Sequence, residues 1–287
     1  MNHKPFIVPP GQAIKLADFD PKSTGPFKSK SKAEPKMQED LVRLAQLQDI
    51  LYAQDRYAMM IIFQGMDTAG KDGIIKHVMS GVNPAGVRVV SFKQPSVEEH
   101  NHDYLWRYWK DLPERGRIGI FNRSYYEEVL VVRIHAEVLE TEHLPPAARG
   151  KGIWRHRYQD MNALERYLVR NGVLVLKFFL NLSKQEQKKR LLDRINTPEK
   201  NWKYSPADIK ERAYWDDYRA AYEETLNHTS TEWAPWYVVP ADHKWFTHTV
   251  VADVVISKLE SLKLGYPKVT AENRAALLEA KKALEKE

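Results

Sequence analysis

The sequence contains no cysteine, and none of the apolar runs in its 287 residues approaches the roughly 18 to 20 residues needed to cross a lipid bilayer. Without cysteine, disulfides and thiolate chemistry are excluded. The opening residues 1–6 lack the apolar core of a signal peptide. We therefore expect a cytoplasmic protein with no membrane partner.

The composition is that of an ordinary globular protein, with 43% hydrophobic and 29% charged residues. The 44 basic residues outnumber the 38 acidic ones, and the net charge of +6 suits a polyanionic partner. We see no zinc-ligand set, no aromatic RNA-binding motif and no basic heptad region, so we expect no nucleic acid as partner. A phosphate-rich small molecule or an inorganic polyanion fits the charge as well.

A glycine-rich segment follows the apolar run at residues 58–63 and precedes a helical pattern. It reads Gly65-Met66-Asp67-Thr68-Ala69-Gly70-Lys71-Asp72. The spacing G-x-x-x-x-G-K is typical of a phosphate-binding loop (P-loop), in which backbone N–H groups surround an anion and the lysine reaches the outer phosphates. The predicted phosphate ligands here are Gly65, Thr68, Ala69, Gly70, Lys71 and Asp72. The alternative is a plain turn between a strand and a helix.

Two carboxylates change how this loop would hold magnesium. The residue after the lysine is usually Ser or Thr, whose hydroxyl binds Mg²⁺, but here it is Asp72. Asp67 lies inside the loop, where it is placed to hold Mg²⁺ or to orient the acceptor. The alternative role for Asp67 is a hydrogen bond to its own backbone.

Strand patterns alternate with helical patterns along the chain. We expect strands at 58–63, 87–92, 117–121, 173–180 and 236–239, with helices at 37–55, from 71, 97–110, 125–136, 154–170, 183–195, 205–226 and 245–264. Ser183 and Glu186 are expected to form a capping box. This alternation predicts a three-layer α/β P-loop kinase fold with a parallel five-stranded sheet and helices on both faces. We expect one domain, with an extended arm at 1–36 and a charged helix at 271–287.

The third strand ends in the polar triplet Asn122-Arg123-Ser124. In open parallel sheets ligands bind at that edge, so Arg123 is a candidate cation for phosphates. Its alternative role is an ion pair that supports the sheet edge. Glu127 and Glu128 follow in the first turn of the next helix, and we expect Glu127 to face the site and Glu128 to face solvent.

Residues 183–205 form a basic segment with a proline-containing turn, which predicts a helical lid over the phosphates. An arginine delivered by such a lid can meet charge in the transition state of phosphoryl transfer. Several of the cations must be plain surface charges. Arg190 and Lys203 are our first candidates, and Arg194 and Lys200 are equal rivals.

Three motifs in this order resemble the second family of polyphosphate kinases. They are the P-loop, the run Phe121-Asn122-Arg123-Ser124-Tyr125-Tyr126-Glu127, and the lid segment Lys200-Asn201-Trp202-Lys203-Tyr204-Ser205. The resemblance covers residues 37–264. Members of that family have a P-loop kinase fold similar to thymidylate kinases and use magnesium to move phosphate between inorganic polyphosphate and nucleotides.

The resemblance implies that Asp67, Lys71 and Arg123 are catalytic and that Asp67 holds the metal. It further implies that the lid cations grip the polyanion or nucleotide, and that Asn122 and Glu127 face the nucleotide. Two positions depart from the common pattern: Asn122 replaces an aspartate and Glu127 replaces an asparagine. This variant resembles the subgroup that phosphorylates both nucleoside mono- and diphosphates, which would convert AMP and ADP to ADP and ATP.

Two other functions stay open at this point. An ATP-dependent nucleoside monophosphate kinase of the thymidylate kinase type shares fold, loop and lid, and a non-catalytic P-loop module could bind nucleotide or polyanion through its basic surface. Aromatic residues expected on the surface, such as Trp106 and Trp109, lead us to expect a homo-oligomer.

Overall fold

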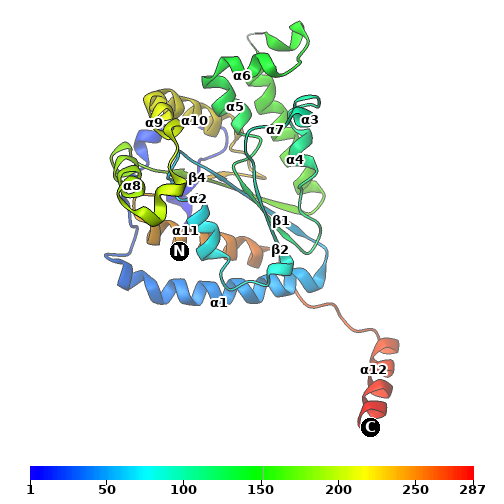
Figure 1. Ribbon diagram of the computed structural model, residues 1–287. Helices are drawn as coiled ribbons and strands as arrows, with labels where there is room; N and C mark the ends of the chain where they lie inside the picture. Colours follow the sequence, from blue (N-terminus) through cyan, green and yellow to red (C-terminus); the bar gives the residue numbers. More distant parts are fainter. Residues whose placement is uncertain (151) are drawn as a thin grey trace.

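A computed structural model describes residues 1–150 and 152–287 (Figure 1). In these residues the strands are β1 (Ala58–Gln64), β2 (Val87–Ser91), β3 (Ile118–Asn122), β4 (Val173–Asn181) and β5 (Trp236–Pro240). They form one parallel sheet in the order β2-β3-β1-β4-β5. The predicted α/β fold with a parallel five-stranded sheet is confirmed.

The sheet lies between two layers of helices; β1 at its centre is buried at every residue, whereas no residue of the edge strand β2 is fully buried. Three helices cover one face: α1 (Lys30–Gln54), α2 (Lys71–Val78) and α11 (Lys244–Ser261). The other face is covered by α5 (Glu127–Ile134), α7 (Ile153–Arg170) and α10 (Trp215–Thr229). Strands buried on both faces read as nearly continuous apolar runs, which is why β1 and β4 stand out in the sequence.

The register places the functional loops at one edge. Phe63 of β1 pairs with Asn122 of β3, so the P-loop after β1 and the triplet that begins at the end of β3 leave the sheet side by side. Because parallel strands share one carboxyl edge, Phe63 and Asn122 meet there although they are 59 positions apart in the chain.

Some helix boundaries differ from the sequence-based prediction. The first helix starts at Lys30 rather than at residue 37 and contains Pro35; its first turns are held by the buried Ala33 and by ion pairs of Lys36 with Asp40 and with Asp253 of α11. Tertiary contacts here outweigh the cost of proline inside a helix.

The helix expected at 97–110 is two short ones, α3 (Val97–His100) and α4 (Trp106–Trp109). Ser96 and Glu99 form a capping box on α3, and the Asp103 side chain accepts a hydrogen bond from the Leu105 N–H, 3.0 Å away, which interrupts the helix. The helix expected at 125–136 ends at Ile134, and α6 (Ala136–Thr141) follows it.

The segment predicted to form a lid, residues 183–205, contains α8 (Lys184–Asn196) and the 3₁₀ helix η5 (Pro198–Lys203), and α9 (Pro206–Glu211) follows it. We keep the word lid for this segment. Another 3₁₀ helix, at Arg212–Tyr214, separates α9 from α10, where one helix was expected over 205–226. Ser183 caps α8 by accepting from the Glu186 N–H (3.0 Å), but the predicted capping box is only half formed. The Ser183 N–H is donated to Asp242 (2.8 Å), and the Glu186 carboxylate accepts from Arg190 (3.0 Å).

The two ends of the chain behave differently. The N-terminal segment packs on the core, because Ile7 bridges Tyr237 antiparallel to β5 and the Val8 N–H donates to the Trp236 carbonyl (2.9 Å). The N-terminal segment thereby covers β5, an edge strand of the sheet. The C-terminal helix α12 (Ala271–Leu284) lies apart from the body (Figure 1). Among the described residues, no helix is both long enough and apolar enough to pass through a membrane.

Candidate functional site

The P-loop joins β1 to α2 with a backbone that requires unusual conformations. Gly70, the N-cap of α2, has φ +107°, a value that side chains rarely allow. Thr68 and Arg123 each have φ +65° without being glycine. Such strained positions concentrate at functional sites, where the surrounding structure maintains them.

Lys71, at the start of α2, folds back over the loop. Its Nζ donates to the Gly65 carbonyl oxygen over 2.7 Å. Burial lowers the pKa of Lys71 to about 8, and the nearby positive charge of Arg123 adds to the effect. A cation held in this way is stabilised by any anion that enters the loop.

Arg123 links the P-loop to the first turn of α5. Its Nη2 donates to Asp67 Oδ1 (3.0 Å) and its Nη1 to Glu127 Oε2 (3.3 Å). The negative charge of Glu127 raises the pKa of Arg123 above its ordinary value. Glu127 is fixed from the other side by Gln64, whose amide donates to Oε1 over 2.9 Å. The predicted residues Asp67, Arg123 and Glu127 thus meet at one point.

Asn122 makes different contacts. Its amide nitrogen donates to Asp72 Oδ1 (2.6 Å) and to Ser91 Oγ (3.3 Å), which ties the end of β3 to the first turn of α2 and to β2. The two predicted nucleotide-facing residues therefore separate: Glu127 and Asn122 line different cavities.

Arg190 of α8 is buried beneath the P-loop. Its five N–H groups donate to five oxygens within the protein: the carbonyls of Thr68, Ala69, Ala241 and Asp242, and the carboxylate of Glu186, at 2.6 to 3.1 Å. These bonds hold the loop from below. Its role as a phosphate ligand stays a prediction.

The other lid cations are partly paired. Arg194 donates to Asp208 over 3.0 Å and Lys200 to Asp193 over 2.7 Å, whereas Lys203 lies over the ring of Trp202, 4.9 Å from its centre. All three line the same cavity as the P-loop.

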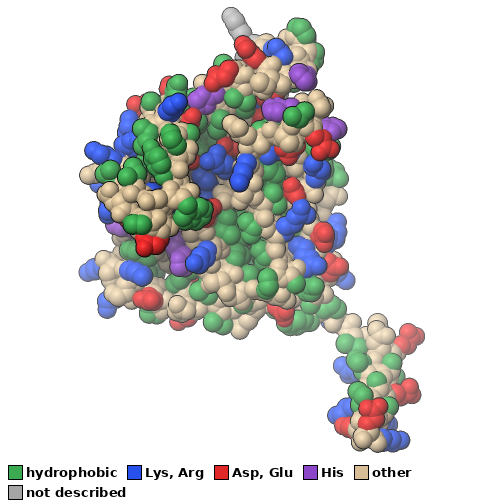
Figure 2. All heavy atoms as spheres, in the orientation of Figure 1, with side chains coloured by type: hydrophobic (Ala, Val, Ile, Leu, Met, Phe, Trp, Pro, Cys, Tyr) green, Lys and Arg blue, Asp and Glu red, His purple; other side chains and the backbone are tan. Residues whose placement is uncertain are grey.

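Two cavities adjoin at this site. The first, the cation-rich cavity, has a volume of about 510 Å³ and lies between the P-loop and the lid. Among the described residues, seven cations face four carboxylates in its wall; the cations are Lys71, Arg123, Arg190, Arg194, Lys200, Lys203 and Lys244. Figure 2 shows lysine and arginine side chains gathered in the hollow beside the lid helices.

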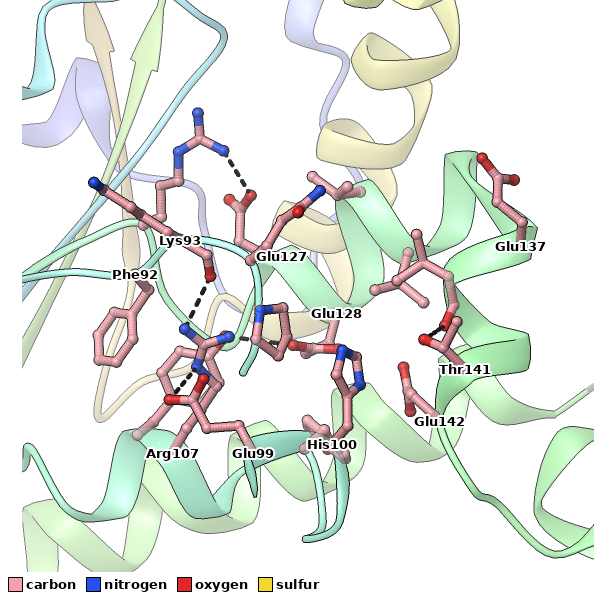
Figure 3. A pocket seen from close by; sticks show the side chains of 18 of the residues that line it. Phe92, Lys93, Glu99, His100, Arg107, Glu127, Glu128, Glu137, Thr141 and Glu142 are labelled. Carbon is pink, nitrogen blue, oxygen red and sulfur yellow. Dashed lines mark hydrogen bonds and ion pairs between the residues drawn. The ribbon is translucent and has the colours of Figure 1, made fainter. Parts of the chain in front are cut away.

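The second, the acid-rich cavity, has a volume of about 560 Å³ and lies between the loop after β2 and the helices α3, α4, α5 and α6 (Figure 3). In the described part of the chain its wall holds eight carboxylates and three Lys or Arg side chains, with the aromatic residues Phe92, Tyr104, Tyr108 and Tyr218. The two cavities share Asp67, Arg123 and Asp208. A ligand that spans both would pass these three residues.

The family model described as Polyphosphate kinase 2 matches residues 27–265. The chain belongs to this family.

Similar proteins cover almost the whole chain. The ADP-polyphosphate phosphotransferase of Rhodopseudomonas palustris is 50% identical over 98% of this chain and 98% of its own length. The AMP/ADP-polyphosphate phosphotransferase of Meiothermus ruber is 40% identical over 96% and 100%. The crystal structure of polyphosphate kinase 2 from Arthrobacter aurescens TC1 matches with a TM-score of 0.84 and 38% identity, covering 95% of this chain and 99% of that one.

Sequence reasoning missed a buried polar network that joins β4, α7 and the two tyrosines before α5. Lys177 of β4 and Glu165 of α7 form a fully buried ion pair with 2.6 Å between Nζ and Oε2. Glu165 Oε1 accepts from the hydroxyls of Tyr125 (2.9 Å) and Tyr126 (2.7 Å), the residues just before α5. The sequence feature that could have indicated this network is Lys177, a single lysine inside the apolar run of β4.

Glu128 was expected in solvent, and this was wrong. Its side chain is 8% exposed, because α5 presents it to the buried Arg157, 3.6 Å away. Burial raises the pKa of Glu128 to about 7. Sequence reasoning also missed Lys244, His77 and His248, which line the cation-rich cavity from α11 and α2. Lys244 and His248 lie far in sequence from every motif, whereas His77 follows Lys71 of the P-loop by six residues.

Proposed function

We propose that this protein transfers the terminal phosphate of inorganic polyphosphate to AMP and ADP, with magnesium, and so forms ADP and ATP. The observation that supports this most strongly is the junction of two oppositely charged cavities at Asp67, Arg123 and Asp208. One cavity suits a chain of phosphates, and the other suits a nucleoside.

The cation-rich cavity would take polyphosphate. Phosphoryl transfer needs positioned phosphates and cations that meet the charge developing on the transferred group. Backbone N–H groups at the start of α2, with Lys71 beside them, are suited to bind its terminal phosphate. Lys203 and the paired lid cations would bind the following part of the chain.

The acid-rich cavity would take the nucleoside part of the acceptor. Its aromatic wall, with Phe92 and Tyr108 4.5 Å apart between ring centres, offers apolar surface for a base. Its carboxylates can accept hydrogen bonds from ribose hydroxyls and disfavour phosphates by charge repulsion. Figure 3 shows Glu99, Glu128 and Glu142 around the same space as His100 and Arg107. An acceptor would therefore enter with its phosphate towards Arg123.

The reaction asks for one bond made and one bond broken. An oxygen of the acceptor's terminal phosphate attacks the end phosphorus of polyphosphate, and the bond from that phosphorus to its bridging oxygen breaks. The shortened chain keeps that oxygen and its charge. Arg123 and Lys71 stabilise the negative charge on the transferred group, and Glu127 and Gln64 keep Arg123 in position.

Magnesium fits the donor set around Asp67. Oδ1 of Asp67 accepts from Arg123, and the described residues offer its Oδ2 no hydrogen-bond donor. No group of three or more His, Cys, Asp or Glu able to hold a metal occurs in the described part of the chain. Mg²⁺ commonly uses one or two carboxylates and completes its shell with substrate phosphates and water. When bound there it would neutralise phosphate charge during transfer.

The names of similar proteins and the position of Glu127 support our proposal of which nucleotides accept phosphate. One similar protein is named for ADP and another for AMP and ADP. Glu127, held by Gln64, would keep Arg123 aimed at the acceptor's phosphate end. We propose that both AMP and ADP are accepted, in the cytoplasm. The exposed Trp109 and Tyr167, 5.8 Å apart between ring centres, form a surface that suits a homo-oligomer.

The test is ATP formation from ADP and from AMP, each with magnesium and long-chain polyphosphate, with Lys71→Ala as control. ATP from both acceptors supports the proposal. ATP from ADP alone keeps polyphosphate as donor and rejects AMP as substrate. If neither reacts, yet AMP becomes ADP when ATP is supplied, an ATP-dependent monophosphate kinase replaces the proposal.

A further inference from the structure

A second cluster of nitrogen donors lies in the cation-rich cavity, away from Asp67. It consists of Lys244 and His248, one turn apart on α11, and His77 in the last turn of α2. The rings of His77 and His248 are 4.6 Å apart between centres. We call these three residues the distal cluster. Neither the P-loop motif nor the lid contains any of them.

Lys244 differs by its partners from five of the other six cations of this cavity; the sixth, Lys203, contacts only the ring of Trp202. Arg123, Arg190, Arg194 and Lys200 each have a carboxylate partner within 3.3 Å, and Lys71 donates to a carbonyl. The described residues give Lys244 neither an ion pair nor a hydrogen-bond partner for its side chain. The two carboxylates whose charge acts on Lys244, those of Asp193 and Glu186, are already paired with Lys200 and Arg190.

The position of Lys244 is electrostatically unfavourable without an anion. It is the first residue of α11, whose first turn contains no acidic residue, and the positive end of a helix favours anions over cations. Burial lowers the pKa of Lys244, and Arg190 and Lys200 add to this effect. Burial likewise lowers the pKa of His248 to about 4, with further contributions from His77, Lys244 and Arg190. Like charges gathered in one cavity indicate an anion site.

We propose that Lys244, His248 and His77 bind a phosphate group of polyphosphate remote from the transferred one, and so make the enzyme prefer long chains. This inference rests on the proposed function, since it assumes polyphosphate in the cation-rich cavity. Lys71 and His77 lie on the same helix, six residues apart, which corresponds to about 9 Å along its axis. A phosphate held at the P-loop cannot also reach the distal cluster, whereas a longer chain can contact both.

The experiment compares kcat/KM for polyphosphates of increasing length, from tripolyphosphate to long chains, with ADP as acceptor. Lys244→Met removes the charge and keeps the length of the side chain. His248→Phe keeps the ring packed on His77 and removes its N–H. The control is Lys189→Met on α8, a lysine that is outside the cavity wall and 80% exposed. Loss of one hydrogen bond to a charged group corresponds to about 10-fold or more.

We expect kcat/KM of the unchanged protein to rise with chain length. In Lys244→Met and His248→Phe the ratio of long-chain to tripolyphosphate kcat/KM should fall about 10-fold, while Lys189→Met keeps the original ratio. Equal ratios in all four proteins would overturn the inference, as would an unchanged protein indifferent to length.

Failure of the proposed function would look different, because no chain length would then give ATP. In that case we would measure by calorimetry the affinity of long-chain polyphosphate for the unchanged protein and for Lys244→Met. Weaker binding by the variant supports the distal cluster, and equal affinity rejects it.

Discussion

Arg123 donates a hydrogen bond to Asp67 over 3.0 Å, and the two side chains join the end of β3 to the P-loop at the boundary of the two cavities. The side chain of Arg123 is 42% exposed and that of Asp67 is 27% exposed, so both can reach a ligand. The residue that would hold the metal and the residue that would meet the phosphate charge therefore orient each other before substrate arrives.

Asp67→Asn tests this arrangement with an isosteric change. The amide oxygen can still accept from Arg123, but the charge that would hold Mg²⁺ is lost. We expect kcat to fall by about 100-fold or more, with little change in unfolding midpoint. Steady-state rates over a magnesium titration measure it. A kcat within a factor of two of the original would contradict the assignment of Asp67.

We expect the ionisation of Lys71 to lower the activity at alkaline pH. With a pKa of about 8 in the free protein, its ammonium is charged below pH 8 and loses its proton as the pH rises through that value. Because kcat/KM reports ionisations of the free enzyme, kcat/KM for polyphosphate should fall above about pH 8. Rates from pH 6.5 to 9.5 show this.

Lys203→Ala is the control for that profile, since it removes a cation of the same cavity without touching Lys71. Its kcat/KM should be lower at every pH and bend at the same point. A flat profile up to pH 9.5 in the original protein would show that Lys71 does not limit the rate.

Arg190→Lys separates support of the loop from phosphate binding. Lysine keeps the charge but cannot replace five donors aimed at five oxygens, so buried carbonyls of Thr68 and Ala69 lose their partner. We expect a loss of about 2 kcal/mol or more in the free energy of unfolding. Urea denaturation measures the loss. If stability is unchanged while KM for polyphosphate rises, Arg190 acts on the ligand instead.

The buried pair of Lys177 and Glu165 predicts strong coupling. Lys177→Met leaves the carboxylate of Glu165 buried without its cation, which should cost about 3 to 5 kcal/mol. Glu165→Gln in the same chain should recover part of the loss. A double-mutant cycle in urea gives the coupling energy, and additive effects of the two changes would refute it.

The sequence predicted the sheet and the P-loop well because their signals are local. Gly70 and Lys71 lie next to an apolar strand, and Asn122 and Arg123 end another, so the carboxyl edge of a parallel sheet brings them together. The distal cluster could not be predicted, because the meeting of His77 with His248 depends on how α11 packs on α2. Glu128 was misplaced because the facing Arg157 comes from a helix that follows it in the chain.

Arg190 also has a consequence for motion. It joins α8 to the backbone of Thr68 and Ala69, and Asn201 of η5 is bonded in turn to the last carbonyls of α8, those of Arg194 and Ile195. Lid and P-loop are therefore linked by one continuous set of hydrogen bonds. They should open as a single cooperative unit, with the amides of α8 and of the loop exchanging hydrogen at a common rate rather than independently.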